Sequence, residues 1–133
     1  MMAETFGSRA AAIVENETGD MVDELWQERT CETGFLPVRR TAYHPLMANM
    51  DDEMVLYEAH YWEAKSLPEG FQLFASTKTT PIQLMAHESL PLFGTQFHPE
   101  AYDDQHQDGK QFLENFFSLV REYEQTGSLL QLA

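Results

Sequence analysis

A histidine and a glutamate flank one proline in the segment LPLFGTQFHPEAYDD, residues 90–104. Pro99 cannot donate to a strand ladder, so the apolar run before it should end as a strand and present His98 and Glu100 at the edge of a sheet. Side chains two positions apart on an extended chain point the same way. A carboxylate beside an imidazole favours the imidazolium and fixes the ring tautomer. The spacing therefore fits the base and the orienting acid of a nucleophilic triad, which needs a nucleophile as its third member.

The spacing alone leaves other roles for this pair open. A lone H-x-E pair is a common pattern, and most such pairs are not catalytic. A metal site is another alternative, because Asp103, Asp104 and His106 follow closely. The segment lacks the C-x-x-C or H-x-x-x-H spacing of common metal sites, which disfavours that alternative. No cofactor is predicted.

The chain is strongly acidic, and it is apolar enough to fold. It has 133 residues, of which 43% are hydrophobic, as is typical of one globular domain with a single core. Its 22 acidic and 8 basic residues give a net charge of −14, which repels phosphate backbones and disfavours a nucleic-acid partner. The charge predicts a solvated acidic surface, and the alternatives are a saline habitat or a basic partner subunit.

Membrane and secretion signals are not evident in the sequence. No apolar run approaches the roughly 18 residues that a membrane-spanning helix needs. The first residues lack the basic region of a signal peptide. Cys31 is the single cysteine, so the chain cannot form an internal disulfide. We therefore expect a cytoplasmic protein without a membrane partner.

Short apolar and alternating runs predict a succession of strands. They cover residues 10–14, 34–41, 54–60, 71–77, 81–88 and 91–98. Pro37 should mark an edge or a bulge, and Phe71, Leu73 and Ala75 should share one face of their strand. The last two runs should form a hairpin. Other expected elements are a helix end at 1–7, turns at 15–20 and 66–71, a short helix or strand at 21–28 and a helical turn within 44–54.

Residues 108–127, DGKQFLENFFSLVREYEQTG, form the clearest helix in the sequence. Asp108 is expected to cap its start and Gly127 its end. Its apolar stripe consists of Phe112, Leu113, Phe116, Phe117, Val120 and Tyr123. The stripe predicts packing against a sheet, with a partner interface as the alternative. Several strands followed by a helix indicate an α/β layered domain.

Longer stretches of the sequence resemble class I (triad-type) glutamine amidotransferases. GTQFHPE is similar to the family's closing G-x-Q-F-H-P-E motif, and ETGFLPVRRT to its E-x-G-x-x-P-V stretch. HPLMANMDDEMVLYEAHYWEAKSLPEGFQLFAST and PIQLMAHESLPLFGTQFHPE match further family motifs in order, and their details favour the GMP-synthase-like branch. The resemblance implies an α/β fold: the C-terminal part of a doubly wound (flavodoxin-like) domain, with a mixed sheet and flanking helices.

The resemblance also assigns site residues position by position. His98 corresponds to the base of the catalytic triad and Glu100 to its orienting acid. Four positions correspond to the glutamine-binding stretch: Tyr57, Glu58, Ala59 and His60. The family often has Gln at the position of Glu58 and a small polar residue at that of Ala59. Side-chain contacts at those two positions should therefore differ from the family's, whereas backbone contacts with the substrate could persist.

The sequence lacks the family's nucleophile motif, G-x-C-x-G-H-Q. That motif is a tight strand-to-helix turn, which exposes a cysteine thiolate at a helix N-terminus. The first residues of this chain resemble the end of the helix that the motif opens in the family, so residues 1–133 are expected to be a partial domain without its N-terminal third. Cys31 has bulky neighbours and falls far from the motif, so we expect it to be a structural or incidental thiol.

The resemblance implies hydrolysis of the glutamine side-chain amide, with the ammonia passed to a synthetase and used in guanine-nucleotide synthesis. The cysteine would come from another polypeptide, so the chain alone should be inactive. The alternatives are a functionless relic and a catalytically inactive binding or regulatory subunit. Expected partners are L-glutamine, a synthetase subunit or the N-terminal segment, and further copies of the chain. Self-association is expected because strand faces within 81–87 and 91–97 would be uncovered.

Overall fold

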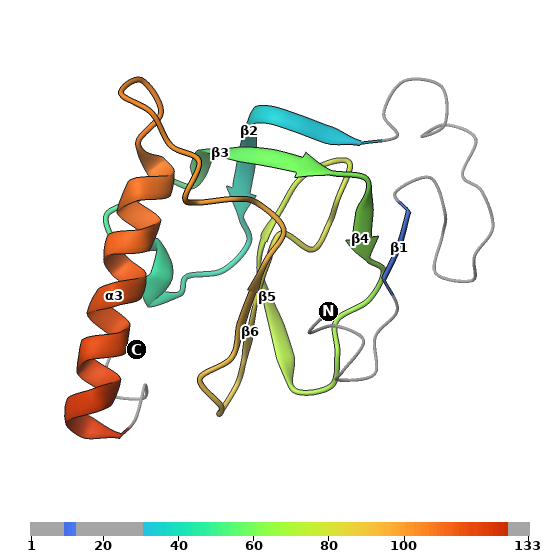
Figure 1. Cartoon of the computed structure of the whole chain (residues 1–133). Helices are drawn as coiled ribbons and strands as arrows, with labels where there is room; N and C mark the ends of the chain where they lie inside the picture. Colours follow the sequence, from blue (N-terminus) through green and yellow to red (C-terminus); the bar gives the residue numbers. More distant parts are fainter. Residues whose placement is uncertain (1–9, 13–30, 128–133) are drawn as a thin grey trace.

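The computed structural model describes residues 10–12 and 31–127. Figure 1 shows a curled sheet with a long helix along one side. The elements are β1 (Ala10–Ala12), β2 (Glu32–Arg40), the 3-10 helix η1 (Pro45–Met47), β3 (Glu53–His60), β4 (Trp62–Ala64), β5 (Phe71–Ser76), β6 (Leu84–His87), β7 (Phe93–Thr95) and the helix α3 (Asp108–Thr126). One sheet has the strand order β3-β2-β5-β6-β7, and β1 pairs with β4 in a second sheet. Every ladder between these described strands is antiparallel.

The antiparallel pair of β2 and β3 has an inward face that changes character along its length. Every second residue of β3 is buried: first the apolar Met54 and Leu56, then the polar Glu58 and His60. This period of two is what a half-buried strand requires. Glu32, at the start of β2, lies opposite His60 and is also buried. The pair therefore begins in the apolar core and ends in a polar cluster.

Pro37 lies where β2 has a locally unpaired edge. It is opposite Val55, whose backbone N–H donates to Asp108 Oδ2 at 2.7 Å and therefore points away from β2. Pro37 and Val55 are thus a non-hydrogen-bonded pair, and the N–H that proline lacks costs no bond to β3. On its other side, β2 pairs with β5 at Arg39 and Arg40, beyond the proline. The proline therefore marks a strand edge, as the sequence predicts.

The strand β5 departs from the predicted alternation. The sequence predicts that Phe71, Leu73 and Ala75 share one face. The ladder with β6 shifts register between Leu73 and Ala75, and Phe74 and Ala75 are both buried. This bulge allows two successive side chains to enter the core. Beyond it, β6 and β7 form the predicted hairpin.

The helix α3 is confirmed, but its buried face differs from the predicted stripe. Its buried residues are Gly109, Phe112, Asn115 and Leu119. Three members of the predicted stripe are exposed instead: Phe117 by 54%, Val120 by 37% and Tyr123 by 40%. The prediction that the whole stripe packs against the sheet is therefore wrong for these three residues.

Asn115 determines which face of α3 packs against η1. Its Nδ2 donates to the carbonyl oxygens of Leu46 at 2.9 Å and Ala48 at 2.8 Å, and its Oδ1 accepts from Gln111 at 3.0 Å. Three hydrogen bonds make burial of this amide favourable. A pattern of apolar residues cannot predict such a polar anchor, because it treats Asn115 as a surface position.

The predicted cap is correct at the C-terminal end of α3 and wrong at its N-terminal end. Gly127 ends the helix in the left-handed conformation, with φ 69°, and its N–H donates to Tyr123 O, as predicted. Asp108 is predicted to cap the start, but the N-cap is Gln107 and has no side-chain cap bond. The Asp108 carboxylate accepts the N–H of Val55 instead. It therefore ties the helix start to β3 rather than to its own first turn.

The main core lies between the five-stranded sheet, η1 and α3. It consists of Val38, Leu46, Met47, Met54, Leu56, Phe74, Ala75, Leu84, Ala86, Phe97, Phe112 and Leu119. A smaller cluster contains Ala64, Phe71 and Met85. Leu84, Met85, Ala86 and Phe97 are all buried. The expectation of uncovered strand faces at 81–87 and 91–97 is therefore wrong for these four residues.

The α/β class is confirmed by this layering of a helix on a sheet. The parallel strands of the expected mixed sheet are not among the described strands. β4 has no counterpart in the prediction, because three residues are too few to show alternation. The elements expected at 1–7, 15–20 and 21–28 lie outside the described residues. None of the described helices is long and apolar enough to span a membrane.

Candidate active site

His98 and Glu100 lie together in the turn that follows β7. His98 Nδ1 is 3.1 Å from Glu100 Oε2, and the two side chains are 44% and 64% exposed. The N–H of His98 donates to Tyr57 O at 2.8 Å, which forms a single bridge beside β3. Ala101 N–H donates to His98 O and closes a turn around Pro99. The side chains pair as their spacing suggests, whereas their catalytic role stays a prediction.

Curling of the sheet brings this turn to β3. In the strand order, β3 and β7 are the outermost strands of the five. Figure 1 shows the chain after β7 crossing back toward β3 and the start of α3. The bridge between Tyr57 and His98 therefore joins the two ends of the sheet. The candidate site lies at this junction.

The start of α3 fixes the turn from the other side. The Gly109 backbone lies so close to Pro99 that a Cβ at this position would be 2.3 Å from the Pro99 carbonyl oxygen. The preceding residue, Asp108, accepts the N–H of Val55 in β3. The helix start, the outer edge of β3 and the His98–Glu100 turn are thus joined by close contacts.

The outer edge of β3 offers backbone groups beside His98. Val55 and Tyr57 direct backbone groups away from β2, to Asp108 and His98. The period of two places the N–H and C=O of Ala59 on the same edge, about 7 Å further along. Ala59 is exposed, and these two groups form no hydrogen bond within the described part of the chain. Among the described residues, nothing competes with a ligand for these two groups.

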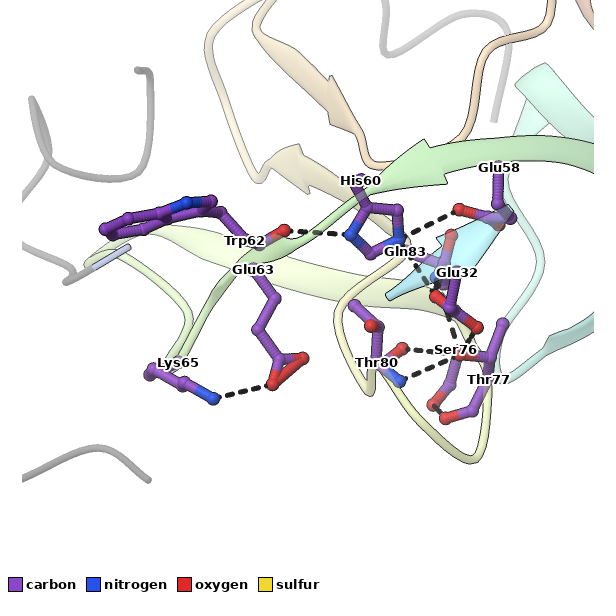
Figure 2. A network of polar contacts seen from close by, with 10 residues as sticks. All are labelled: Glu32, Glu58, His60, Trp62, Glu63, Lys65, Ser76, Thr77, Thr80 and Gln83. Carbon is purple, nitrogen blue, oxygen red and sulfur yellow. Dashed lines mark hydrogen bonds and ion pairs between the residues drawn. The ribbon is translucent and has the colours of Figure 1, made fainter. Parts of the chain in front are cut away.

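Glu58 and His60 point away from this edge into a buried cluster, which also contains Glu32 (Figure 2). Glu32, Glu58 and His60 are 5%, 0% and 9% exposed. His60 Nε2 lies 2.9 Å from Glu32 Oε1 and 3.2 Å from Glu58 Oε1. His60 Nδ1 lies 2.8 Å from the carbonyl oxygen of Trp62. The Glu58 side chain therefore points away from a ligand on the outer edge of β3, and its backbone groups face Gly34 of β2.

The two carboxylates of this cluster are satisfied unequally. Glu32 Oε1 accepts from Gln83 Nε2 at 2.9 Å, and Glu32 Oε2 accepts from Thr77 Oγ1 at 2.8 Å. Neither Glu58 oxygen has a hydrogen-bond partner among the described residues. His60 Nε2 is near Glu58, but its N–H has hydrogen-bond geometry toward Glu32. Glu58 is therefore a buried carboxylate without a hydrogen-bond donor of its own.

The pKa values of the three groups reflect burial and mutual contact. Burial raises the pKa of Glu58 above its usual range. Burial also acts to raise the pKa of Glu32, but hydrogen bonds from His60 and Thr77 outweigh it and lower that pKa. For His60, burial is outweighed by its hydrogen bond to Glu32 and its close contact with the Glu58 carboxylate, which raise its pKa to about 9. The His60 imidazolium is therefore stable at neutral pH.

No site role is predicted for Glu32 from the sequence, although this residue is central to the cluster. Glu32 and His60 are 28 positions apart in the chain and meet because β2 pairs with β3. One feature of the sequence could have pointed to a role for Glu32: it is the glutamate of the stretch that resembles the family's E-x-G motif. Thr77 and Gln83 also lie in stretches that resemble family motifs, but their spacing in the sequence does not indicate that they contact Glu32.

Cys31 lies away from His98. It directly precedes β2, and β3 lies between β2 and the His98 turn. Because Glu32 is opposite His60, Cys31 is offset along the strands from Tyr57 by about four residues, or roughly 13 Å. This geometry agrees with the expectation that the Cys31 thiol is not the nucleophile that His98 would serve.

The remaining described histidines have structural partners. His44 Nδ1 accepts the N–H of Leu46, and the ring packs edge-on against two phenylalanines. His87 Nδ1 accepts two backbone N–H groups of the hairpin turn. His106 lies 2.9 Å from Asp103 and stacks on an aromatic ring of β2. His106 and Asp103 therefore form an exposed pair, and the metal site considered there stays a disfavoured alternative.

Fold and sequence together identify the family. Residues 1–120 match the family model for class-I glutamine amidotransferases, and this chain belongs to that family. Its relatives include glutamine-hydrolyzing GMP synthases. The A subunit of the Thermococcus kodakarensis GMP synthase is 45% identical over 67 residues, which are 50% of this chain and 35% of the relative. The corresponding protein of Pyrococcus furiosus is 42% identical over 99 residues, 74% of this chain and 52% of the relative.

Solved structures agree with this assignment. A Thermoplasma acidophilum protein proposed to be the A subunit of a GMP synthase has a TM-score of 0.73 at 25% identity, covering 93% of this chain and 54% of that one. A glutamine amidotransferase from Thermotoga maritima, at 14% identity, has a TM-score of 0.58 over 96% of this chain and 45% of that one, which shows the fold alone. The GMP-synthase-like class I assignment is therefore confirmed. The chain spans about a third to a half of the length of the curated relatives described above.

Proposed function

We propose that this chain supplies the base and the orienting acid for hydrolysis of the glutamine side-chain amide. The observation that carries the proposal is the pairing of His98 Nδ1 with Glu100 Oε2 at 3.1 Å, beside the open edge of β3. The carboxylate accepts the Nδ1–H, so Nε2 is left to exchange protons with substrate. His98 and Glu100 are the proposed catalytic residues.

The proposed reaction proceeds through a thioester. A cysteine thiolate attacks the carboxamide carbon, and the C–N bond breaks as the His98 imidazolium gives its proton to the departing ammonia. Neutral His98 then takes a proton from water, which attacks the thioester and releases glutamate and the thiolate. Glu100 acts through His98, because it fixes the ring tautomer and stabilises the imidazolium.

The proposed nucleophile lies outside these 133 residues. Cys31 is the single cysteine of the sequence and is separated from His98 by β3. We therefore treat residues 1–133 as a partial domain, completed by a segment with the nucleophile motif. Glutamine would lie along the outer edge of β3, where the backbone of Ala59 is open and Tyr57 and Glu58 flank it. The buried His60 would support this edge from behind.

Complementation tests this proposal. The chain would be mixed with, or fused to, the N-terminal part of the Pyrococcus furiosus relative, and ammonia release from L-glutamine would be measured. We expect no release from the chain alone and release from the complemented protein. His98→Gln should lower the rate by roughly 10²–10⁴-fold, the usual contribution of general acid–base catalysis. Glu100→Gln should lower it less and shift its pH profile.

The controls separate catalysis from folding. His106→Gln removes another exposed histidine that pairs with an acid, and it should leave the rate unchanged. A cysteine-to-serine change in the added segment should abolish release. If the complemented protein released ammonia at the same rate with His98→Gln, the proposed base would be wrong. A folded complex that binds glutamine without hydrolysing it would favour the alternative, an inactive binding or regulatory subunit.

We further propose that the ammonia passes to a synthetase subunit that makes GMP. Support comes from the relatives, which are the A subunits of glutamine-hydrolyzing GMP synthases. The net charge of −14 would complement a basic docking surface on such a partner. Self-association of the chain also stays a prediction, which light scattering can test.

A further inference from the structure

The buried cluster of Glu32, Glu58 and His60 is a set of ligand atoms as well as a hydrogen-bonded network. One oxygen from each carboxylate and one imidazole nitrogen all lie within 4.8 Å of one another. Both oxygens of Glu58 lack a hydrogen-bond donor within the described part of the chain, although this side chain is fully buried. A fully buried carboxylate without a donor is costly. The single charge of the His60 imidazolium, 3.2 Å from Glu58 Oε1, balances only one of the two carboxylates. A divalent cation would balance both.

Two of the three separations between ligand atoms fit one metal ion. His60 Nε2 is 2.9 Å from Glu32 Oε1 and 3.2 Å from Glu58 Oε1. An ion about 2.1 Å from two ligand atoms holds them roughly 3.0 Å apart at a right angle and roughly 3.4 Å apart at the tetrahedral angle. Both separations fall in or just below this range, so small side-chain shifts would complete the coordination.

The surroundings of the ligands are those of a metal site. The Trp62 carbonyl can only accept, so His60 carries a proton on Nδ1, 2.8 Å from that oxygen. This bond directs Nε2 toward the two carboxylates, as in most metal-binding histidines. Thr77 and Gln83 donate to Glu32 and fix its orientation in turn. Figure 2 shows these partners gathered around Glu32 and His60.

Charge also favours a divalent ion. Two carboxylates and one neutral imidazole carry a charge of −2, which a divalent cation neutralises. Binding replaces the Nε2 proton of His60, which is released to solvent. One nitrogen and two oxygen ligands suit Zn²⁺ or Mn²⁺ better than Mg²⁺, which prefers oxygen ligands and retains its waters.

We infer that Glu32, Glu58 and His60 form a structural binding site for a divalent transition-metal ion. The ion would join the start of β2 to the end of β3, the strand whose outer edge carries His98. An open cleft of about 520 Å³ is lined by Glu32, Thr77 and Lys78 among others, so one of the three proposed ligands borders it. The site is separate from the His98–Glu100 pair and does not depend on the proposed reaction.

Metal titration of the full chain tests the inference. The chain would be stripped with a chelator, and Zn²⁺, Mn²⁺ and Mg²⁺ would be added separately while binding and the melting temperature are followed. We expect about one Zn²⁺ per chain and a rise in melting temperature that grows with Zn²⁺ concentration. Mg²⁺ at the same concentration should produce no comparable rise.

Glu58→Gln is the sharpest variant, because it keeps the shape of the side chain and removes one ligand charge. It should lower Zn²⁺ affinity by about 100-fold or more. Without metal it should be at least as stable as the wild type, because the buried charge is gone. His106→Gln, which removes an exposed histidine–carboxylate pair, should bind Zn²⁺ as the wild type does.

Two outcomes would overturn the inference. They are the absence of stoichiometric Zn²⁺ binding by the wild-type chain, and undiminished binding by Glu58→Gln. If Glu58→Gln does not fold, Zn²⁺ binding by Thr77→Val provides the test instead. This variant keeps all three ligands but removes the hydrogen bond that orients Glu32, so it should weaken Zn²⁺ binding by roughly 10-fold. Unchanged affinity in Thr77→Val would then count against the site.

Discussion

His44 shows how a single half-buried side chain can couple stability to pH. Its Nδ1 accepts the N–H of Leu46 at 3.1 Å, and its ring packs edge-on against Phe74 and Phe93. Burial among these aromatic side chains lowers the pKa of His44 from 6.5 to about 4. The folded protein therefore holds a neutral ring at pH values where the unfolded chain would bind a proton.

The change His44→Asn should make stability less sensitive to acid. Because the folded pKa is the lower one, the contribution of His44 is fully present above pH 6.5 and is lost as the pH falls toward about 4. Urea unfolding at pH 7 and pH 4.5 should show the wild type losing about 2 kcal/mol more than His44→Asn, allowing for partial solvent contact. The asparagine oxygen can still accept the Leu46 N–H. Equal losses in the two proteins would contradict this assignment.

At the scale of elements, the candidate site depends on how α3 starts. Gly109 allows the helix to approach the carbonyl of Pro99, and Asp108 binds the backbone of Val55. The turn that carries His98 and Glu100 therefore packs against both α3 and β3. The far end of the same helix has a different glycine, Gly127, where positive φ and not close approach is the constraint.

The change Gly109→Ala should therefore affect both stability and activity. Its Cβ would meet backbone atoms, which cannot move independently of the turn. We expect a loss of about 2 kcal/mol in unfolding free energy and slower ammonia release in the complemented protein. Gly127→Ala is the matched control: it should cost about 1 kcal/mol by strain at φ 69° and leave the rate unchanged. Equal rates for Gly109→Ala and wild type would contradict the role of this contact.

At the scale of the whole molecule, the dominant feature is the net charge of −14. Basic residues such as Arg39 and Arg40 form ion pairs with Glu53 and Asp52 at the surface. Part of the positive charge is therefore already neutralised locally. The acidic excess should destabilise the compact state by self-repulsion. Salt screens such repulsion, because the Debye length falls from about 30 Å at 0.01 M to about 3 Å at 1 M.

Raising the salt concentration should therefore stabilise the chain. Between about 10 mM and 500 mM NaCl we expect a gain of about 1 kcal/mol, or roughly 3–6 °C in melting temperature. The measurement is a thermal melt followed by circular dichroism in metal-free buffer. KCl at equal ionic strength is the control and should produce the same rise. A melting temperature that stays constant or falls would show that self-repulsion is not the dominant electrostatic effect.

Agreement between sequence and structure is best where a feature depends on neighbours in the chain. His98 and Glu100 are two positions apart in a segment bounded by a proline, so their pairing follows from local geometry. The ends of the long strands and the αL cap at Gly127 are local in the same sense. The bulge in β5 and the buried face of α3 were not predicted, because they depend on partners elsewhere in the chain.

The sequence by itself determined the family, the α/β class and the His98–Glu100 pair, because short motifs and strand periodicity record local conformation directly. The tertiary structure alone decided that Glu58 and His60 face inward to Glu32 rather than outward beside His98. A shift of one residue in the pairing of β2 and β3 would place those side chains on the opposite face. That register depends on side chains far apart in sequence, and no local pattern records it.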